Sequence, residues 1–303
     1  MTAVTDRPPV VTSRRDPTQP TTPAEAAPRV IAVGVRDHEY DEAALRFAIA
    51  EARAGRDSLH VVHSYLPVRL DGCSWEPVQR ARDARYVAGR RAVAQAVQRV
   101  REAAPGLAVD GSAVAGLPSD VLDEISAFVD LLVIGDDSAA PPGRVSGART
   151  TWWAQDAARC PVVSVPPGRA VWSGRPVTVV LSEHGSTETV RFAADWAEAH
   201  RAMLRISQPA EVTAVPESAA VLAASQEDLD IQACEWQRRC PGLGVVARIE
   251  RDPQWLASVA ARSSVLVVSA RDAALVRRSG VVLRCPTITV PAHPTSGPGR
   301  AGS

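Results

Sequence analysis

Short apolar runs alternate with longer amphipathic segments along most of the chain. Residues 29–35 form a run of mostly β-branched and small residues that is too short for a helix and apolar on both faces. This is typical of a central strand in a parallel sheet. Residues 41–54 then place Phe47, Ala48 and Ala52 at helical spacing, and Gly55 follows as a stop signal. The pattern predicts a strand followed by a helix.

The same alternation continues as far as residue 165. Alternating strands and helices favour a parallel sheet that is covered by helices on both faces and joined by right-handed crossovers. The chain is therefore predicted to be an α/β protein. Further strands are expected at residues 59–65, 107–114, 131–134 and 160–165, and further helices at residues 79–104, 116–128 and 151–158.

Four short motifs recur in the second half of the chain in the same order. Self-similarity of this kind indicates a repeated structural unit. The number of residues between each motif and its repeat falls along the chain, which shows that the second copy is shorter than the first. The matched segments are 46–48 with 191–193, 105–107 with 241–243, 131–134 with 265–268, and 160–166 with 285–291.

The repeat predicts two domains, residues 29–167 and 176–291. Residues 168–175 belong to a segment rich in Pro and Gly, and they are the expected linker. Residues 1–28 and 292–303 have no long apolar run, so we expect disordered tails at both ends.

Composition narrows the classes of function. The 303 residues include 34 basic and 34 acidic side chains, so the formal net charge is zero. This removes the electrostatic argument for nonspecific binding to nucleic acid or to an anionic membrane. No stretch reaches the roughly 20 apolar residues that span a bilayer. The five cysteines are odd in number and widely spaced, unlike a paired zinc or redox site. We expect a cytoplasmic protein with reduced thiols and no nucleic-acid, membrane or metal site.

Several motifs of the first half, in their order and spacing, resemble the universal stress protein family, in particular its actinobacterial tandem type with two domains in one chain. The resemblance covers residues 29–167 and, more weakly, 175–291. The motifs that carry it are VGV at 33–35, AALRFA at 43–48, LHVVH at 59–63, GLP at 116–118 and CPVV at 160–163.

The resemblance implies two flavodoxin-like open parallel sheets with the strand order 3-2-1-4-5. It also implies a pseudo-dimer within the chain, in which the fifth strands at 162–165 and 287–290 meet at the interface, and it allows a further homodimer. A ligand of such a sheet lies beyond the carboxyl ends of the strands, where the strand order reverses.

Nucleotide-binding members of the family carry an acidic residue after the first strand. After the fourth strand they have a loop of glycine, two residues, glycine, nine residues, glycine and then Ser or Thr. Here the acidic position holds an arginine, the loop keeps one of its three glycines, and Asp136 and Asp137 add negative charge where phosphates would lie. The resemblance therefore implies at most weak binding of ATP, with magnesium, in the first domain. The implied ligand residues are Val35, Arg36, Asp37, Val62, Gly135, Ser138, Ala148 and Arg149.

The second domain departs further from the pattern. Its loop starts at Ser269, is nine residues shorter than the loop of the first domain, and has no glycine at 270–278. Glycines let backbone N–H groups approach phosphates closely, so we expect no nucleotide in this domain.

Several of these residues also have ordinary structural explanations. Loop acids are commonly solvated, arginines form surface ion pairs, and a Cys-Pro at the start of a strand buries its thiol. No Gly-x-Ser-x-Gly motif marks a hydrolase nucleophile, and we predict no catalytic residue. The residues with such an alternative explanation are Arg36, Asp37, His60, His63, Asp136, Asp137, Arg149, Trp152, Trp153, Cys160 and Cys285.

Three hypotheses for function remain. The leading one is a stress-associated regulatory or binding module that is not an enzyme. The alternative is a purely structural or protein-interaction member that binds no nucleotide. The third is an ATP-hydrolysing or nucleotidyl-transferring enzyme on a related fold, but the Ser-Gly-Gly-x-Asp-Ser loop of such enzymes is missing. Binding of ATP separates the first two, and turnover tests the third.

Overall fold

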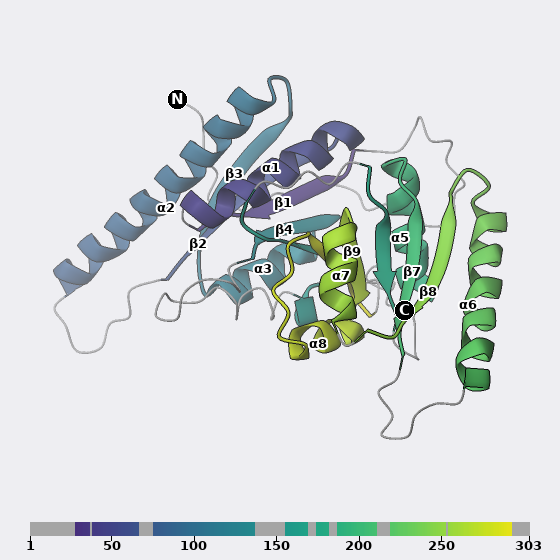
Figure 1. Ribbon diagram of the computed structural model, residues 1–303. Helices are drawn as coiled ribbons and strands as arrows, with labels where there is room; N and C mark the ends of the chain where they lie inside the picture. The colour runs from purple at the N-terminus through teal and green to yellow at the C-terminus, as the bar shows by residue number, and fades with distance from the viewer. Residues whose placement is uncertain are drawn as a thin grey trace, which may run out of the picture. The chain divides into compact units, whose positions relative to one another are not determined.

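Two compact units make up the described part of the chain, with the boundary between Pro167 and Gly168. Figure 1 shows their strands and helices, which alternate along both units. The computed structural model describes residues 28–36, 38–66, 75–136, 155–168, 174–181, 187–210, 219–252 and 254–292.

The sheet of the first unit consists of short strands paired in parallel. β1 (Val30–Gly34) lies between β2 (Ser58–Tyr65) and β4 (Leu131–Gly135). β3 (Val109–Ala115) pairs with the other side of β2, and β5 (Val162–Val165) with the other side of β4. The order across this unit is therefore β3-β2-β1-β4-β5.

Burial on both faces explains why the central strands are apolar throughout. Ile31, Ala32 and Val33 of β1 have no exposed surface, and all of β4 is buried. Because successive side chains of a strand point to opposite faces, such burial needs helices on both sides of the sheet. The predicted α/β architecture with a parallel sheet is confirmed.

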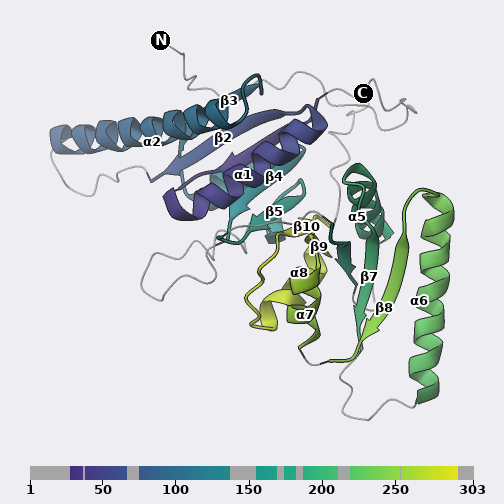
Figure 2. The ribbon, with the colours of Figure 1, turned by 45° about the horizontal axis from the view of Figure 1, so that its top comes forward.

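Helices of the first unit pack on both faces of its sheet. α1 (His38–Gly55) packs on β1 and β4, while α2 (Trp75–Ala103) packs on β2 and β3 (Figure 2). α3 (Pro118–Ser126) contributes Leu122 to a core cluster with residues of β1, β4 and β5. Gly111 of β3 permits the close approach of α2, because a Cβ there would lie 2.6 Å from Cγ1 of Val93.

Two helices begin earlier than the sequence predicted. α1 starts at His38 and not at residue 41, and Asp41 accepts the N–H of Arg36 from within the helix. α2 starts at Trp75 and not at residue 79. Pro77 lies in its first turn, where the missing N–H costs no hydrogen bond.

The second unit repeats the order of elements. Its strands pair in parallel in the order β8-β7-β6-β9-β10. None of the helices in the described ranges of either unit combines the length and apolar character needed to cross a membrane. The strands are β6 (Val177–Val180), β7 (Leu204–Pro209), β8 (Val245–Glu250), β9 (Val265–Ser269) and β10 (Thr287–Val290), and the helices are α5 (Thr187–Ala199), α6 (Ala219–Arg239), α7 (Trp255–Arg262) and α8 (Ala270–Arg278).

Candidate functional site

A hollow lies at the carboxyl ends of β1 and β4 in the first unit. The chain leaves β1 toward β2 on one side, while β4 pairs on the other, and ligands of open parallel sheets bind at such a reversal. The walls come from β1 and the two residues after it, from β2, from β4 and from the start of α3. The lining residues are Gly34, Val35, Arg36, Val62, Ser64, Pro118, Val121, Leu122, Ile134 and Gly135.

Half of the predicted ligand residues meet at this hollow. Val35, Arg36, Val62 and Gly135 all line it, and the pairing of β1 with β2 and β4 brings them together. Their binding to a nucleotide stays a prediction. The predicted residues that lie outside the described part of the chain are Asp37, Ser138, Ala148 and Arg149, together with Asp137, Trp152 and Trp153.

Arg36 is held at the mouth of the hollow by both its main chain and its side chain. Its N–H donates to Oδ2 of Asp41 at 2.6 Å, and Asp41 is buried on α1. Its Nη2 donates to the carbonyl oxygen of Gly135 at 3.3 Å. The guanidinium therefore lies between the ends of β1 and β4, where it adds positive charge beside the place where a ligand would enter.

Main-chain groups around the hollow are largely used within the protein. The N–H of Val35 donates to the carbonyl of Val62 at 2.8 Å. The carbonyl of Val35 lies 2.9 Å from Nδ1 of His63, which must be the donor because a carbonyl oxygen only accepts. The N–H of Asp136 donates to Val165 at 2.7 Å. These amides are not available to a ligand, and the side chains of Val35 and Val62 leave an apolar wall.

The sequence prediction missed the wall that α3 provides. Pro118, Val121 and Leu122 come from the element after β3, and only the packing of α3 against the sheet brings them to the hollow. Ser64 could have been found, since it lies two residues after Val62 and alternate residues of a strand share a face.

A polar cluster on β2 and β3 has the atoms of a serine-histidine-aspartate triad. Nδ1 of His60 contacts a carboxylate oxygen of Asp110, and Nε2 lies 3.0 Å from Oγ of Ser112. A nucleophile must reach its substrate, but Ser112 is 6% exposed while the Asp110 side chain is 73% exposed. This is the reverse of a catalytic triad, in which the serine is accessible and the aspartate is buried. We therefore interpret the cluster as a polar contact between β2 and β3. This agrees with the structural role predicted for His60.

In the second unit a helix starts directly after the fourth strand. α8 begins directly after β9, and Ser269 is its N-cap residue. Oγ of Ser269 accepts the N–H of Asp272 at 3.0 Å and donates to the Asp272 carboxylate at 2.8 Å. A buried acid thus lies in the first turn of this helix, where it already complements the positive end of the helix dipole.

Sequence comparison finds a family for the first unit. Residues 28–166 match the model of the universal stress protein family. No curated protein matches the chain. The match covers the described elements that form the hollow, and we call the first unit the family-matched unit from here on.

Solved structures share the fold along most of the chain. A universal stress protein from Archaeoglobus fulgidus DSM 4304 has a TM-score of 0.61 and 13% identity, with 87% of this chain and 96% of that chain covered. A protein described as functionally unknown from Pseudomonas aeruginosa PAO1 has a TM-score of 0.57 and 18% identity, with 89% and 95% covered. At these identities the likeness shows the fold alone.

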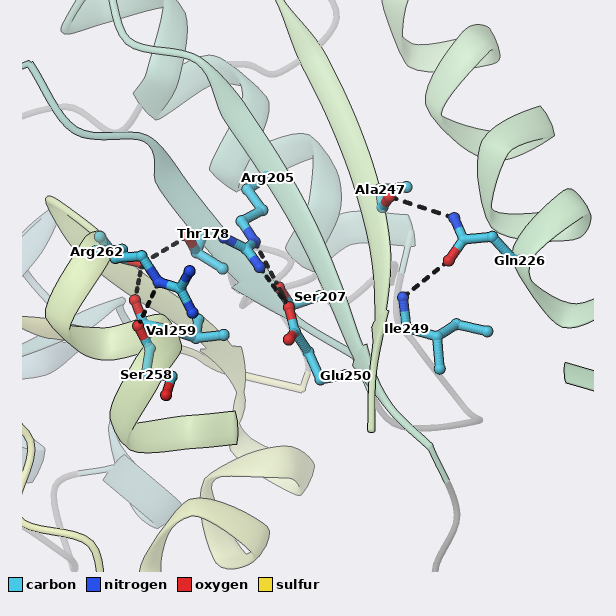
Figure 3. Close-up of polar contacts among 11 residues, drawn as sticks. Thr178, Arg205, Ser207, Gln226, Ala247, Ile249, Glu250, Ser258, Val259 and Arg262 are labelled. Carbon is cyan, nitrogen blue, oxygen red and sulfur yellow. Dashed lines mark hydrogen bonds and ion pairs between the residues drawn. The ribbon is translucent and has the colours of Figure 1, made fainter. Parts of the chain in front are cut away.

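A mostly buried ion pair joins β7 and β8 of the second unit (Figure 3). Nη2 of Arg205 lies 2.5 Å from Oε1 of Glu250, and Ser207 donates to the same oxygen at 3.1 Å. Ser207 pairs with Val180 of β6 as Val62 pairs with Gly34 of β1. Ser207 therefore joins a polar network at the strand position where the family-matched unit has Val62, an apolar residue in the wall of the hollow.

The two Cys-Pro strands bury their thiols, as predicted. Cys160 and Cys285 are 5% and 3% exposed. Burial raises the pKa of each thiol to about 12, and nearby Asp130 contributes to the rise at Cys160. Because thiolates are the reactive form, these two side chains are inert packing groups at neutral pH.

Proposed function

We propose that this chain is a two-domain universal stress protein that works as a stress-associated binding or regulatory module in the cytoplasm. The family match of residues 28–166 supports this for the first domain. The repeated motifs and the repeated strand pairing support a diverged copy in the second. The observation that carries the proposal is the hollow, where predicted ligand residues from three strands meet.

The proposed ligand of the hollow is an adenine nucleotide, held weakly. The side chains of Val35, Val62 and Leu122 form an apolar wall that suits the face of a base. The guanidinium of Arg36 suits a phosphate, since its planar fork matches phosphate oxygens. The bonded amides of Val35 and Asp136 limit recognition by the main chain, which is why weak binding is expected.

The second domain is proposed to bind no nucleotide. The internal cap of α8 by Ser269 and Asp272 uses the helix start that a phosphate would need. In this proposal the second domain completes a pseudo-dimer with the family-matched unit through the fifth strands, β5 and β10. Pairing of these strands would protect two sheet edges. No catalytic role is proposed for either domain.

Calorimetric titration of the full-length protein with ATP, with and without magnesium, tests the proposal. We expect saturable binding of one ATP per chain. Gly135→Trp fills the mouth of the hollow and should abolish the heat. Ser64→Trp does the same from β2, in case the first variant fails to fold. Gly242→Trp is the matched control, because nothing lies within 4 Å of a Cβ at that position.

Two outcomes would contradict the proposed ligand. Absence of heat up to millimolar ATP would favour the alternative, a structural or protein-interaction member without a nucleotide. Binding that survives in both blocked variants, with folding verified by circular dichroism, would place the ligand elsewhere. Steady release of phosphate during the titration would instead support the enzyme hypothesis.

A further inference from the structure

Side chains of α6 cover the outer edge of β8, the last strand of the second unit. The amide of Gln226 donates to the carbonyl oxygen of Ala247 at 3.3 Å and accepts the N–H of Ile249 at 3.1 Å (Figure 3). Gln237 accepts the N–H of Val245 at 3.2 Å. The amide of Gln226 thus contacts the two main-chain groups that a neighbouring parallel strand would use.

The corresponding edge of the family-matched unit is open. β3 is the last strand on its side of that sheet. The carbonyl of Ala108 and the N–H of Gly116 bond to the β2 side, and the bonding direction alternates along a strand, so the odd-numbered residues of β3 direct their N–H and C=O groups away from β2. Within the described part of the chain these outward groups have no hydrogen-bond partner. The residues are Val109, Gly111, Ala113 and Ala115.

No described residue of α2, the helix in the place of α6, caps this edge. α2 packs on the face of β2 and β3 to which Gly111 points, since a Cβ there would lie 2.6 Å from Cγ1 of Val93. Gln98 of α2 donates to Glu102 of the same helix at 2.9 Å and not to the strand. A row of unpaired N–H and C=O groups is a template for another extended backbone.

We propose that β3 pairs with β3 of a second copy of this chain, antiparallel about a two-fold axis at Ser112. Val109 then lies opposite Ala115 of the other copy. Gly111 lies opposite Ala113, so that all four outward residues form hydrogen-bonded pairs. An axis at Gly111 would leave Ala115 opposite a residue outside β3, and an axis at Ala113 would do the same to Val109.

The side chains also suit this register. On the face away from α2, Asp110 lies opposite Val114 and Ser112 lies opposite its own copy, so no like charges meet. A peptide of unrelated sequence needs no such self-complementarity, which is why a second copy is the favoured occupant. The contact uses the same strand in both copies and therefore closes at two.

Proline on the edge strand tests the proposal. Ala113→Pro and Ala115→Pro each remove an outward N–H and leave the hydrogen bonds to β2 in place; the second variant serves if the first fails to fold. Ala247→Pro is the matched control, because it alters an outward residue of β8, whose edge Gln226 already covers. Sedimentation equilibrium of the full chain gives the dimer dissociation constant. A salt concentration of about 0.5 M screens repulsion between two copies of the arginine-rich α2.

The proposal expects the full chain to dimerise. Each proline variant of β3 should dimerise at least about tenfold more weakly, because a donor is lost from both copies. Ala247→Pro should stay within about twofold of wild type. A wild-type chain that stays monomeric overturns the proposal. Dimerisation that the two β3 variants leave unchanged, or that Ala247→Pro weakens as much, does the same.

A disulfide tests the register without proline. In Asp110→Cys/Val114→Cys the new thiols lie opposite each other across the axis, in a pair whose Cα atoms are about 4.5 Å apart, within reach of a disulfide. On one strand the same positions are roughly 13 Å apart and cannot be bridged. A mild oxidant should convert the double variant to a covalent dimer, whereas Asp110→Cys alone, the control for the native cysteines, should match wild type. A double variant that forms no more covalent dimer than this control overturns the proposed pairing.

Discussion

Nη2 of Arg36 donates a hydrogen bond to the carbonyl oxygen of Gly135, over a distance of 3.3 Å. This contact joins the segment after β1 to the last residue of β4, and both residues line the hollow. Positive charge is thereby held beside the carboxyl ends of the strands. In the proposed function this charge serves the phosphates of the ligand.

Replacing Arg36 by Gln should weaken ATP binding about tenfold, because a charged hydrogen bond contributes about 1.5–3 kcal/mol and part of it is retained by the amide. Binding of adenosine, which has no phosphate, should stay within about twofold. Calorimetry with both ligands measures the difference. The control is Arg53→Gln, an exposed arginine of α1. Equal losses for ATP and adenosine would mean that Arg36 only supports the shape of the hollow.

Gly111→Ala should destabilise the family-matched unit by about 1–3 kcal/mol, the usual cost of overpacking. Its Cβ would lie 2.6 Å from Cγ1 of Val93 and 2.8 Å from the carbonyl oxygen of Val61, and the latter is main chain that cannot move aside. Urea unfolding followed by circular dichroism gives the change. Gly242→Ala meets nothing within 4 Å and should be neutral. An unchanged midpoint for Gly111→Ala would contradict this overpacking.

The effects on stability of replacing Arg205 and Glu250, the ion pair of the second unit, should be strongly coupled. The side chains of Arg205 and Glu250 are only 12% and 9% exposed, so removing one partner leaves a charge that is mostly buried. Arg205→Met or Glu250→Gln alone should cost about 3 kcal/mol. The double variant should cost less than the two single costs together, and a double-mutant cycle from urea unfolding measures the difference. Additive losses would show that the two side chains act independently.

Stability should fall at high pH because of the two buried thiols. An unfolded cysteine has a pKa near 9.0, whereas burial raises the pKa of Cys160 and Cys285 to about 12. The unfolded chain therefore releases these protons first, so the stabilising contribution is complete below pH 9 and is lost as the pH rises toward 12. The loss is at most about 1.4 kcal/mol per pH unit for each thiol.

The comparison that isolates this effect uses Cys160→Ala/Cys285→Ala. Other groups titrate equally in both proteins, so the difference between their unfolding free energies from pH 8 to pH 11 reports the thiols alone. The wild type should lose its advantage over the variant as the pH rises. A constant difference across this range would contradict the raised pKa values.

Periodicity predicted the parallel α/β architecture because the central strands are apolar on both faces, as the neighbouring buried residues Ile31 and Ala32 show. Helix starts were less predictable. Pro77 looks like a break in the sequence, yet it is tolerated in the first turn of α2. Asp41 resembles a start signal, but its carboxylate accepts Arg36 from within α1.

The candidate site was predictable where it depends on strand ends. Val35 and Gly135 follow from the position of β1 and β4, since carboxyl ends of parallel strands share one edge. Val121 and Leu122 come from a helix whose packing is tertiary, and the sequence pattern does not say which strand they will face. The contact of His60 with Ser112 depends on the register between β2 and β3, which periodicity alone does not fix.

Hydrogen exchange of the full-length protein, with and without saturating ATP and magnesium, shows most directly which domain holds the ligand. Peptides that cover the ends of β1, β2 and β4, around Val35, Val62 and Gly135, should become protected. Peptides around Ser269 and α8 should stay unchanged. Protection centred on α8, or no protection anywhere at millimolar ATP, would contradict a nucleotide site in the family-matched unit.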